Sequence, residues 1–309
     1  MQMDIAVAPS VPDPLSVEMT VARSEAYLGG KLTMGRFDYC LNTSTIRSPG
    51  VSVLEYVDIA ADAGYDGIEP WVEEIDAWVE GGGTLPQLRD HAAGRGIRIV
   101  NLIAFFEWAV PEADRHALGL EEARRCFEMA QILDCPFVAT APKGIHDREV
   151  DLFSVVRRFA ELTDAVSNFS PKPLLEFWGV SRTLGTVGEA LLVAAESGVR
   201  DARLLTDIFH MYKGSGHQRG MDYLDPGRLG LVHVNDYPSD PPRADIEDEH
   251  RVYPGDGEAP WDEIVASLVR QEYRGMLSLE LFNPAYWAEG PVATARKGLA
   301  KLRACVEAV

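Results

Sequence analysis

The stretch LLTDIFH, residues 204–210, reads as a buried strand that ends in an acid and is followed, three residues later, by an imidazole. It belongs to one of eight short apolar runs that recur along the chain after Met34: RFDYCLN (36–42), DGIEPW (66–71), IRIVNLIAFF (97–106), PFVATAP (136–142), KPLLEFW (172–178), ARLLTDIFH (202–210), LGLVHVND (229–236) and GMLSLELF (275–282). We expect each run to form a strand.

Helical patterns separate these runs, with apolar residues three and four positions apart. They are VLEYVDIAADAG (53–64), LPQLRDHAAGRG (85–96), LEEARRCFEMAQILDC (120–135), DLFSVVRRFAELTDAV (151–166), TVGEALLVAAESG (186–198) and WDEIVASLVRQEY (261–273). Gly64, Gly96 and Gly198 each follow such a pattern directly, where glycine most easily adopts the left-handed conformation that ends a helix.

Strands that alternate with helices over this length predict parallel βαβ units, and eight such units close into a (β/α)8 TIM barrel. The alternative is an open doubly wound sheet, but no GxGxxG or GxxxxGK[ST] motif opens any of the predicted helices. We therefore predict a single α/β barrel domain over residues 31–309, preceded by an N-terminal arm or extension over residues 1–30.

Composition narrows the class of partner. The chain of 309 residues has 29 basic and 48 acidic residues and a formal charge of −19, which disfavours nucleic acid. It has neither a long apolar run of membrane-spanning length nor a secretory signal pattern, so we expect a cytoplasmic protein without membrane association. Its cysteines lie in apolar patterns without a CxxC pair and are expected to be reduced core thiols: Cys40, Cys126, Cys135 and Cys305.

Ionisable residues gather at the predicted strand ends, which is where TIM barrels place their working residues. They are Glu69, Glu176, Asp207, His210, His233 and Glu280. One such residue alone is explained by a hydrogen bond within the core, but three unpaired carboxylates buried together are costly unless a cation neutralises them. We predict a metal held by Glu176, Asp207, His233 and Glu280. Three carboxylates with one imidazole and no thiolate favour Mn²⁺, while Mg²⁺, Co²⁺ and Zn²⁺ also fit.

The same motifs carry a resemblance to a known family. LLEFW, LLTDIFH, LVHVNDYP, RVYPGDGEAPWDEIVASL and YRGMLSLELF, together with LNTSTIR and AGYDGIEPW, resemble the sugar phosphate isomerase/epimerase family, the xylose isomerase-like TIM barrels. The resemblance covers residues 34–305 and implies a divalent metal on the four ligands above, with His210 of the DxxH motif contacting substrate or the surroundings of the metal.

The resemblance also implies the reaction class. In the epimerases and isomerases of that family, the two metal-bound glutamates exchange protons beside a carbonyl, so Glu176, Glu280 and His210 are the predicted catalytic residues. Other members are dehydratases of inososes and dehydroshikimate, or lyases that cleave C-glycosides. A metal-stabilised enediolate serves both outcomes, so a lyase stays the alternative to an isomerase or epimerase.

Substrate contacts are expected from loops and rim aromatics. The candidates are Lys143, His146, Arg182, Arg251, Trp71 and Trp178, with Arg243 as an alternative to Arg251. Arg182 stands where the epimerases carry a substrate-binding glutamate, which argues against simple ketose 3-epimerisation. The long loop over residues 239–260 is expected to fold over the mouth as a lid. Aromatic walls without a phosphate cradle predict an unphosphorylated keto sugar or polyol substrate.

Three other hypotheses follow from the sequence. Abasic-site endonucleases share this barrel, but they use three zinc ions and more histidines, and the charge of this chain opposes DNA binding. A non-catalytic metal-binding subunit is a second possibility. The N-terminal arm and the apolar C-terminal helix around residues 294–309 each suit a subunit contact, so a homo-oligomer is predicted, with a different partner chain as the alternative.

Overall fold

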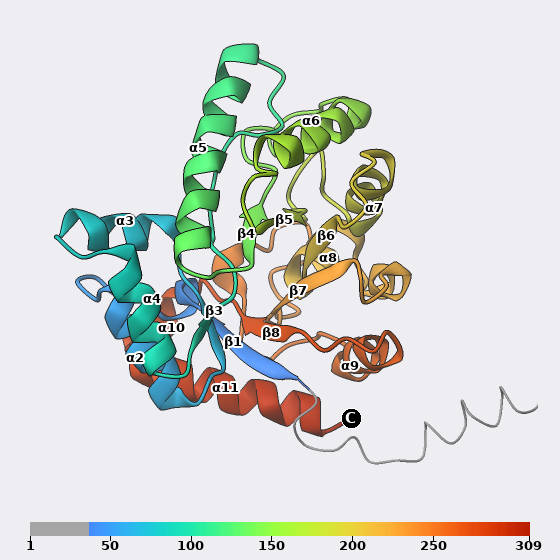
Figure 1. Ribbon diagram of the computed structural model, residues 1–309. Coiled ribbons are helices and arrows are strands. Elements are labelled where there is room, and N and C mark those ends of the chain that lie inside the picture. Colours follow the sequence, from blue (N-terminus) through green and yellow to red (C-terminus); the bar gives the residue numbers. More distant parts are fainter. Residues whose placement is uncertain (1–36) are drawn as a thin grey trace, which may run out of the picture. The chain divides into compact units, whose positions relative to one another are not determined.

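The computed structural model describes residues 37–309, and the predicted N-terminal arm lies outside the described residues. Figure 1 shows a ring of strands surrounded by helices. The strands are β1 (Asp38–Asn42), β2 (Gly67–Glu69), β3 (Arg98–Ile99), β4 (Phe137–Thr140), β5 (Lys172–Glu176), β6 (Arg203–Asp207), β7 (Leu229–Val234) and β8 (Met276–Leu279). Each of the eight predicted runs therefore contains a strand.

The strands form one parallel sheet in the order β3-β2-β1-β8-β7-β6-β5-β4. An isolated bridge joins the two ends of that order: the Leu102 N–H donates to the Phe137 carbonyl at 3.1 Å, and the Ala139 N–H donates to the Leu102 carbonyl at 3.0 Å. These two hydrogen bonds close the sheet into a ring, so the predicted α/β barrel of the xylose isomerase-like type is confirmed.

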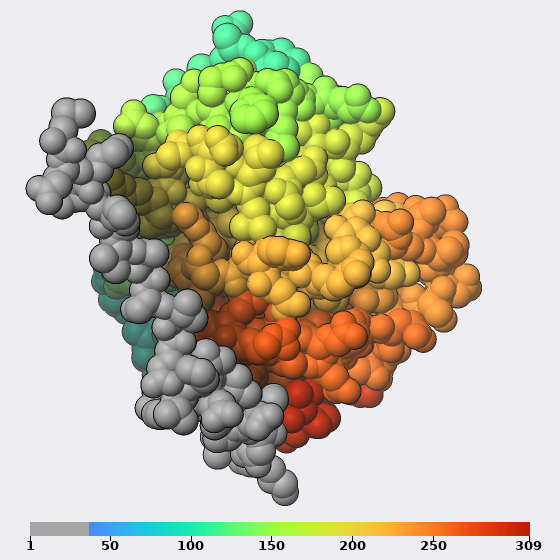
Figure 2. Space-filling model, turned by 90° about the vertical axis from the view of Figure 1, so that its right-hand side faces the viewer, coloured from blue at the N-terminus to red at the C-terminus, as the bar shows by residue number. Residues whose placement is uncertain are grey.

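In the part of the chain that the structure describes, eight α-helices lie between consecutive strands, and the last two follow β8. They are α2 (Val53–Ala63), α3 (Val72–Glu80), α4 (Leu85–Gly94), α5 (Ala113–Ile132), α6 (Leu152–Ala165), α7 (Val187–Glu196), α8 (Ile208–Ser215), α9 (Trp261–Arg270), α10 (Pro284–Glu289) and α11 (Pro291–Glu307). Figure 2 shows successive segments side by side in chain order, from green through yellow and orange to red. No helix in residues 37–309 is long and apolar enough to cross a bilayer.

Local sequence explains where several helices begin and end. The hydroxyl groups of Ser52 and Thr186 each accept a hydrogen bond from the backbone N–H of the glutamate three residues later. The carboxylate of that glutamate in turn accepts one from the backbone N–H of the capping residue. Gly64, Gly96 and Gly198 all have positive φ angles, of 93°, 72° and 75°, as the sequence predicts.

One prediction about the elements is wrong. The apolar run around LLTDIFH is not a strand throughout, because β6 ends at Asp207 and α8 begins at Ile208. The Asp207 carboxylate accepts a hydrogen bond from the His210 N–H at 3.0 Å and so caps the new helix. His210 therefore lies in the first turn of a helix rather than in a strand.

Two apolar layers make up the core. The inner layer fills the barrel: Cys40, Val100, Ile103, Ala139, Leu174, Leu205, Leu231 and Met276. The outer layer lies between the strands and the helices and includes Leu175, Leu204, Val232 and Leu277. Successive strand residues thus alternate between the two layers. The four cysteines are free thiols, and Cys40, Cys126 and Cys135 are buried, as predicted, whereas Cys305 near the end of α11 is only partly buried.

The packing of α5 gives a stability prediction. A Cβ atom at Gly119 of α5 would lie 2.5 Å from the backbone oxygen of Glu107, whereas a Cβ atom at Gly94 of α4 would meet nothing within 4 Å. We expect Gly119→Ala to lower the free energy of unfolding by about 1–3 kcal/mol. Gly94→Ala, the matched control, should raise it by about 0.5–1 kcal/mol because alanine favours a helix. Urea unfolding measures both, and equal effects would contradict the packing argument.

Candidate metal centre and its cavity

The alternation of strand residues brings four predicted ligands to the barrel axis. Each of Leu174, Leu205 and Leu231 belongs to the inner layer, and the residue two positions later is a predicted ligand: Glu176, Asp207 or His233. Met276 has the same relation to Glu280 across two such steps. Side chains two positions apart on a strand point to the same face. All four ligands therefore face inward at the carboxyl ends of β5 to β8.

Three of the four come close together. One ligand atom each of Asp207, His233 and Glu280 lies within 4.8 Å of the others, and all three residues are buried. The His233 Nδ1 atom is 3.2 Å from the Glu280 Oε2 atom and 3.7 Å from the Asp207 Oδ2 atom. Glu176 is outside this close group and lines the adjoining cavity.

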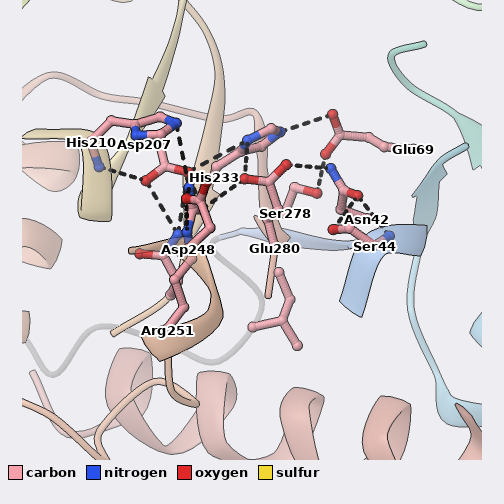
Figure 3. A network of polar contacts seen from close by, with 12 residues as sticks. Asn42, Ser44, Glu69, Asp207, His210, His233, Asp248, Arg251, Ser278 and Glu280 are labelled. Carbon is pink, nitrogen blue, oxygen red and sulfur yellow. Dashed lines mark hydrogen bonds and ion pairs between the residues drawn. The ribbon is translucent and has the colours of Figure 1, made fainter. Parts of the chain in front are cut away.

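The His233 ring is oriented by a carboxylate on its other side. Its Nε2 atom lies 3.0 Å from the Glu69 Oε2 atom. The Glu69 carboxylate also accepts hydrogen bonds from the Asn101 amide at 2.8 Å and from the Ser278 hydroxyl. Figure 3 shows His233 between Glu69 on one side and Asp207 and Glu280 on the other. Because Glu69 can hold the proton on Nε2, Nδ1 is free to present its lone pair.

This arrangement fits a divalent cation. The Nδ1 atom of His233 is buried and has no hydrogen-bond partner among the described residues, although two carboxylates face it. A carboxylate–histidine pair behind a ligand nitrogen is typical of protein metal sites. Burial lowers the pKa of His233, but Glu280 and Glu69 outweigh burial and raise the pKa well above its usual value. The carboxylates of Glu280 and Glu69 thus favour positive charge at the His233 ring.

Neighbouring side chains fix the two carboxylates of the close group. The amide of Asn235 donates to the Asp207 Oδ1 atom at 3.2 Å, and the amide of Asn42 donates to the Glu280 Oε1 atom at 2.9 Å. The second oxygen of each carboxylate accepts a hydrogen bond from the Arg251 guanidinium, at 2.8 Å in both cases. Each carboxylate is therefore held at both oxygens.

Arg251 is the buried cation of the site, with 1% of its residue surface exposed. It comes from the loop between β7 and α9, and its guanidinium lies 4.5 Å from the Phe209 ring centre and 5.2 Å from that of Phe282. Asp248 of the same loop accepts from its Nε atom at 3.0 Å and from its Nη2 atom at 2.6 Å. The predicted lid loop thus contributes two charged side chains to the site.

The pKa values of two buried acids, Glu176 and Asp207, are shifted in opposite directions. Burial raises the pKa of Glu176 to about 8, and the nearby Glu280 and Asp207 add to this rise while His233 opposes it. Burial also acts to raise the pKa of Asp207, but Arg251, His210 and His233 outweigh it and hold that pKa below its usual range. In the protein alone, Asp207 is a carboxylate at neutral pH, whereas Glu176 is poised to hold or release a proton.

A cavity of about 300 Å³ adjoins these groups. Its apolar walls are Trp71, Ile103, Phe105, Trp178, Val180 and Phe282. Its polar groups are His146, Glu176, His210, Asp248, Arg251 and Glu280. A small pocket with aromatic walls and a few convergent polar groups is typical of a small-molecule site.

Four of the six predicted substrate-binding residues line this cavity, and two do not. Trp71, Trp178, His146 and Arg251 line the cavity, as does His210. Lys143 and Arg182 are absent from its walls: the Lys143 Nζ atom lies 5.8 Å from the Phe105 ring centre, and the exposed Arg182 pairs with Glu149 at 3.1 Å. Arg243 donates to the Lys213 carbonyl at 2.8 Å, away from the ligands. Their roles toward a substrate stay predictions.

Four residues around the ligands were not predicted as site residues: Asn42, Glu69, Asn235 and Asp248. Glu69 ends β2, and the sequence does place an acid at that strand end. Its role as the partner of His233 depends on a contact across 164 positions of the chain, which no local pattern reveals. Asn42 and Asn235 are likewise polar residues at or just after strand ends, where spacing alone signals an inward direction.

The sequence is similar to those of two kinds of known enzyme. Over 275 residues, the chain is 28% identical to the inosose isomerase of Halalkalibacterium halodurans, an alignment that covers 83% of this chain and 93% of that one. It is 27% identical over 255 residues to the 3-dehydroshikimate dehydratase of Pseudomonas aeruginosa, covering 80% of this chain and 39% of the dehydratase.

The fold has solved counterparts. The structure of an IolI protein with a bound zinc atom superposes with a TM-score of 0.81 at 20% identity, covering 88% of this chain and 99% of that one. Residues 57–305 match the family described as the xylose isomerase-like TIM barrel. Because that match takes in most of the chain, this protein belongs to the xylose isomerase-like TIM barrel family.

Proposed function

We propose that this protein is a divalent-metal-dependent isomerase or epimerase of an unphosphorylated keto sugar or polyol derivative. The observation that carries the proposal is the placing of two buried glutamates, Glu176 and Glu280, on one small cavity beside the Asp207–His233 pair. The similarity to inosose isomerase supports the same reaction class.

In this proposal Glu176, Asp207, His233 and Glu280 hold one divalent ion. Three carboxylates and one imidazole suit Mn²⁺, our preferred ion, and the zinc in the IolI structure belongs to a protein with the same fold. When bound, the ion supplies electrostatic stabilisation to the negative charge that develops on a substrate carbonyl oxygen.

The protein's own residues would carry the proton. A C–H bond beside a carbonyl needs a base within reach and an acid that returns the proton. Glu176 ends β5 and Glu280 directly follows β8, so the two lie at different positions around the ring. In the protein alone, burial raises the pKa of Glu176 to about 8, so its proton affinity is higher than that of an exposed glutamate. We assign Glu176 and Glu280 to proton transfer and His210 to a hydrogen bond with the substrate.

The cavity suggests the substrate class. A volume of about 300 Å³ accommodates a single sugar or polyol ring rather than a longer chain. Trp71, Trp178 and Phe282 offer aromatic surface to the apolar faces of such a ring. Among the described residues, Arg251 is the one lysine or arginine on the cavity wall, and it already pairs with three carboxylates, so it is not free to bind a phosphate group.

A dehydratase is the second candidate. Its support is the similarity to 3-dehydroshikimate dehydratase, together with two imidazoles, His146 and His210, on the cavity wall. Either ring is in a position to protonate a hydroxyl group that leaves from the carbon beta to the carbonyl. The same proton abstraction by a glutamate would then end in loss of water.

Deuterium exchange distinguishes the candidates. We expect the Mn²⁺-loaded protein, incubated in D₂O with keto sugars, inososes and 3-oxo-glycosides, to incorporate deuterium beside the carbonyl of at least one substrate. NMR reads the exchange, and ultraviolet absorbance reads any enone. Exchange without an enone or released aglycone supports the isomerase, whereas either product supports a lyase. Absence of exchange from the whole panel would refute both.

Substitution of the two glutamates tests their roles. We expect Glu176→Gln and Glu280→Gln each to lower kcat by about 10²–10⁴-fold, because an amide cannot transfer the proton. Glu289→Gln is the matched control, since Glu289 is at the end of α10 and pairs only with Lys297 among the described residues. A scaffold subunit without catalysis would show no turnover for any of these variants to lower.

The Glu69–His233 pair predicts a change in metal affinity. Glu69→Gln removes the charge that favours a proton on Nε2 of His233, so we expect Mn²⁺ binding to weaken about 10–100-fold. Calorimetric titration of the metal-free protein measures it. Glu74→Gln is the control, because Glu74 is a partly buried carboxylate that accepts hydrogen bonds from the Thr43 hydroxyl and the Trp71 N–H instead. Equal affinities for Glu69→Gln and the unaltered protein would exclude the proposed role of Glu69.

A further inference from the structure

The loop that carries Arg251 is tied together by one buried carboxylate, that of Asp236. The residue is fully buried and lies two positions after the end of β7. Its Oδ1 atom accepts hydrogen bonds from the backbone N–H groups of Tyr237 and Ala259, both at 2.8 Å. Its Oδ2 atom accepts from the Gly255 N–H at 2.9 Å and from the indole of Trp261 at 3.0 Å. A single side chain thus joins the start of the loop to its end.

The backbone adds a second tie beside Arg251. The N–H of Asp236 donates to the Val252 carbonyl at 3.0 Å, and the N–H of Val252 donates back to Asp236 at 2.9 Å. The Asn283 amide donates to the Arg251 carbonyl at 3.0 Å. At Gly257, a Cβ atom would lie 2.3 Å from the Tyr237 oxygen, so only glycine permits this close approach.

These hydrogen bonds fix the backbone around Arg251 and so restrict where its guanidinium can lie. Arginine loses much rotational freedom when its guanidinium is held in one place, so a fixed backbone lowers the cost of that placement. Figure 3 shows Arg251 and Asp248 against Asp207 and Glu280. Asp236 itself is absent from the cavity wall, and its four donors all belong to the loop or to the first residue of α9.

We infer that Asp236 is a positioning residue, which acts on the metal centre through Arg251 by fixing the loop that delivers the guanidinium to Asp207 and Glu280. The inference rests on the proposed function for its metal but not for its reaction. Asp236 is expected to contact neither substrate nor metal, and its influence is expected to disappear when Arg251 has no guanidinium.

The inference predicts that loss of Asp236 or of the Arg251 guanidinium raises the affinity for a divalent ion. The guanidinium and a divalent ion are like charges that share the carboxylates of Asp207 and Glu280. Moving the guanidinium away removes a repulsion over a few ångströms, which is worth about tenfold in affinity even with water-like screening. A loop substitution that merely damaged the fold would weaken metal binding instead.

A double-mutant cycle tests the inference. Mn²⁺ affinity is measured by calorimetry on the full-length, metal-free protein with Asp236→Asn, Arg251→Met and both together. We expect each single variant to bind Mn²⁺ about tenfold more tightly, and the double variant to bind no more tightly than Arg251→Met. Additive shifts, weaker binding by Asp236→Asn, or an unchanged affinity in either single variant would each overturn the inference.

Two more variants control for folding. Trp261→Phe removes one of the four donors to Asp236 and should shift the affinity in the same direction by a smaller factor. Asp222→Asn alters a carboxylate that accepts from Ser267 at 2.6 Å on α9 and should leave the affinity unchanged. Thermal unfolding verifies that each variant is folded. A protein that shows this pattern but no turnover would contradict the proposed reaction and leave the inference standing.

Discussion

The burial of like charges is the constraint on which this site depends. Glu176, Asp207 and Glu280 expose 6%, 1% and 5% of their surface. Buried carboxylates near one another are strongly destabilising unless positive charge and hydrogen bonds surround them. The protein meets this constraint with Arg251 on one side of the group and with His233, itself held by Glu69, on the other. A divalent ion would add to the same balance, which is why the geometry favours one.

Both the strands and the loop between β7 and α9 contribute side chains to the site. The strands supply the proposed ligands, whose direction follows from the alternation between the inner and outer apolar layers, so these positions are as rigid as the barrel itself. The loop between β7 and α9 supplies Arg251 and Asp248, whose positions depend on how that loop is held. Asp236 joins the two, since it follows β7 by two residues and holds the loop that starts there. In this way the rigidity of the barrel extends to a side chain on a loop.

Sequence reasoning succeeded where local pattern determines structure. Eight apolar runs between helical patterns predict the barrel, and an acid or imidazole at the end of a run predicts a side chain at its mouth. It failed where a contact depends on distant segments. The partner of His233 is Glu69, 164 positions away, and the guanidinium of Arg251 reaches across 44 positions to Asp207. His210 was misplaced because an apolar run hides the point at which Asp207 starts a helix.

The opposite pKa shifts of two acids suggest how one site could bind a cation and also move a proton. Asp207 accepts hydrogen bonds from Arg251, Asn235 and the His210 N–H, and these contacts keep it charged, as its proposed role as a metal ligand requires. Glu176 has fewer such contacts and a pKa of about 8, so in the protein alone it holds a proton at neutral pH. A neighbouring divalent ion would favour its charged form, and loss of that proton would accompany metal binding. The environment of each acid, more than its type, would then decide which one anchors and which one reacts.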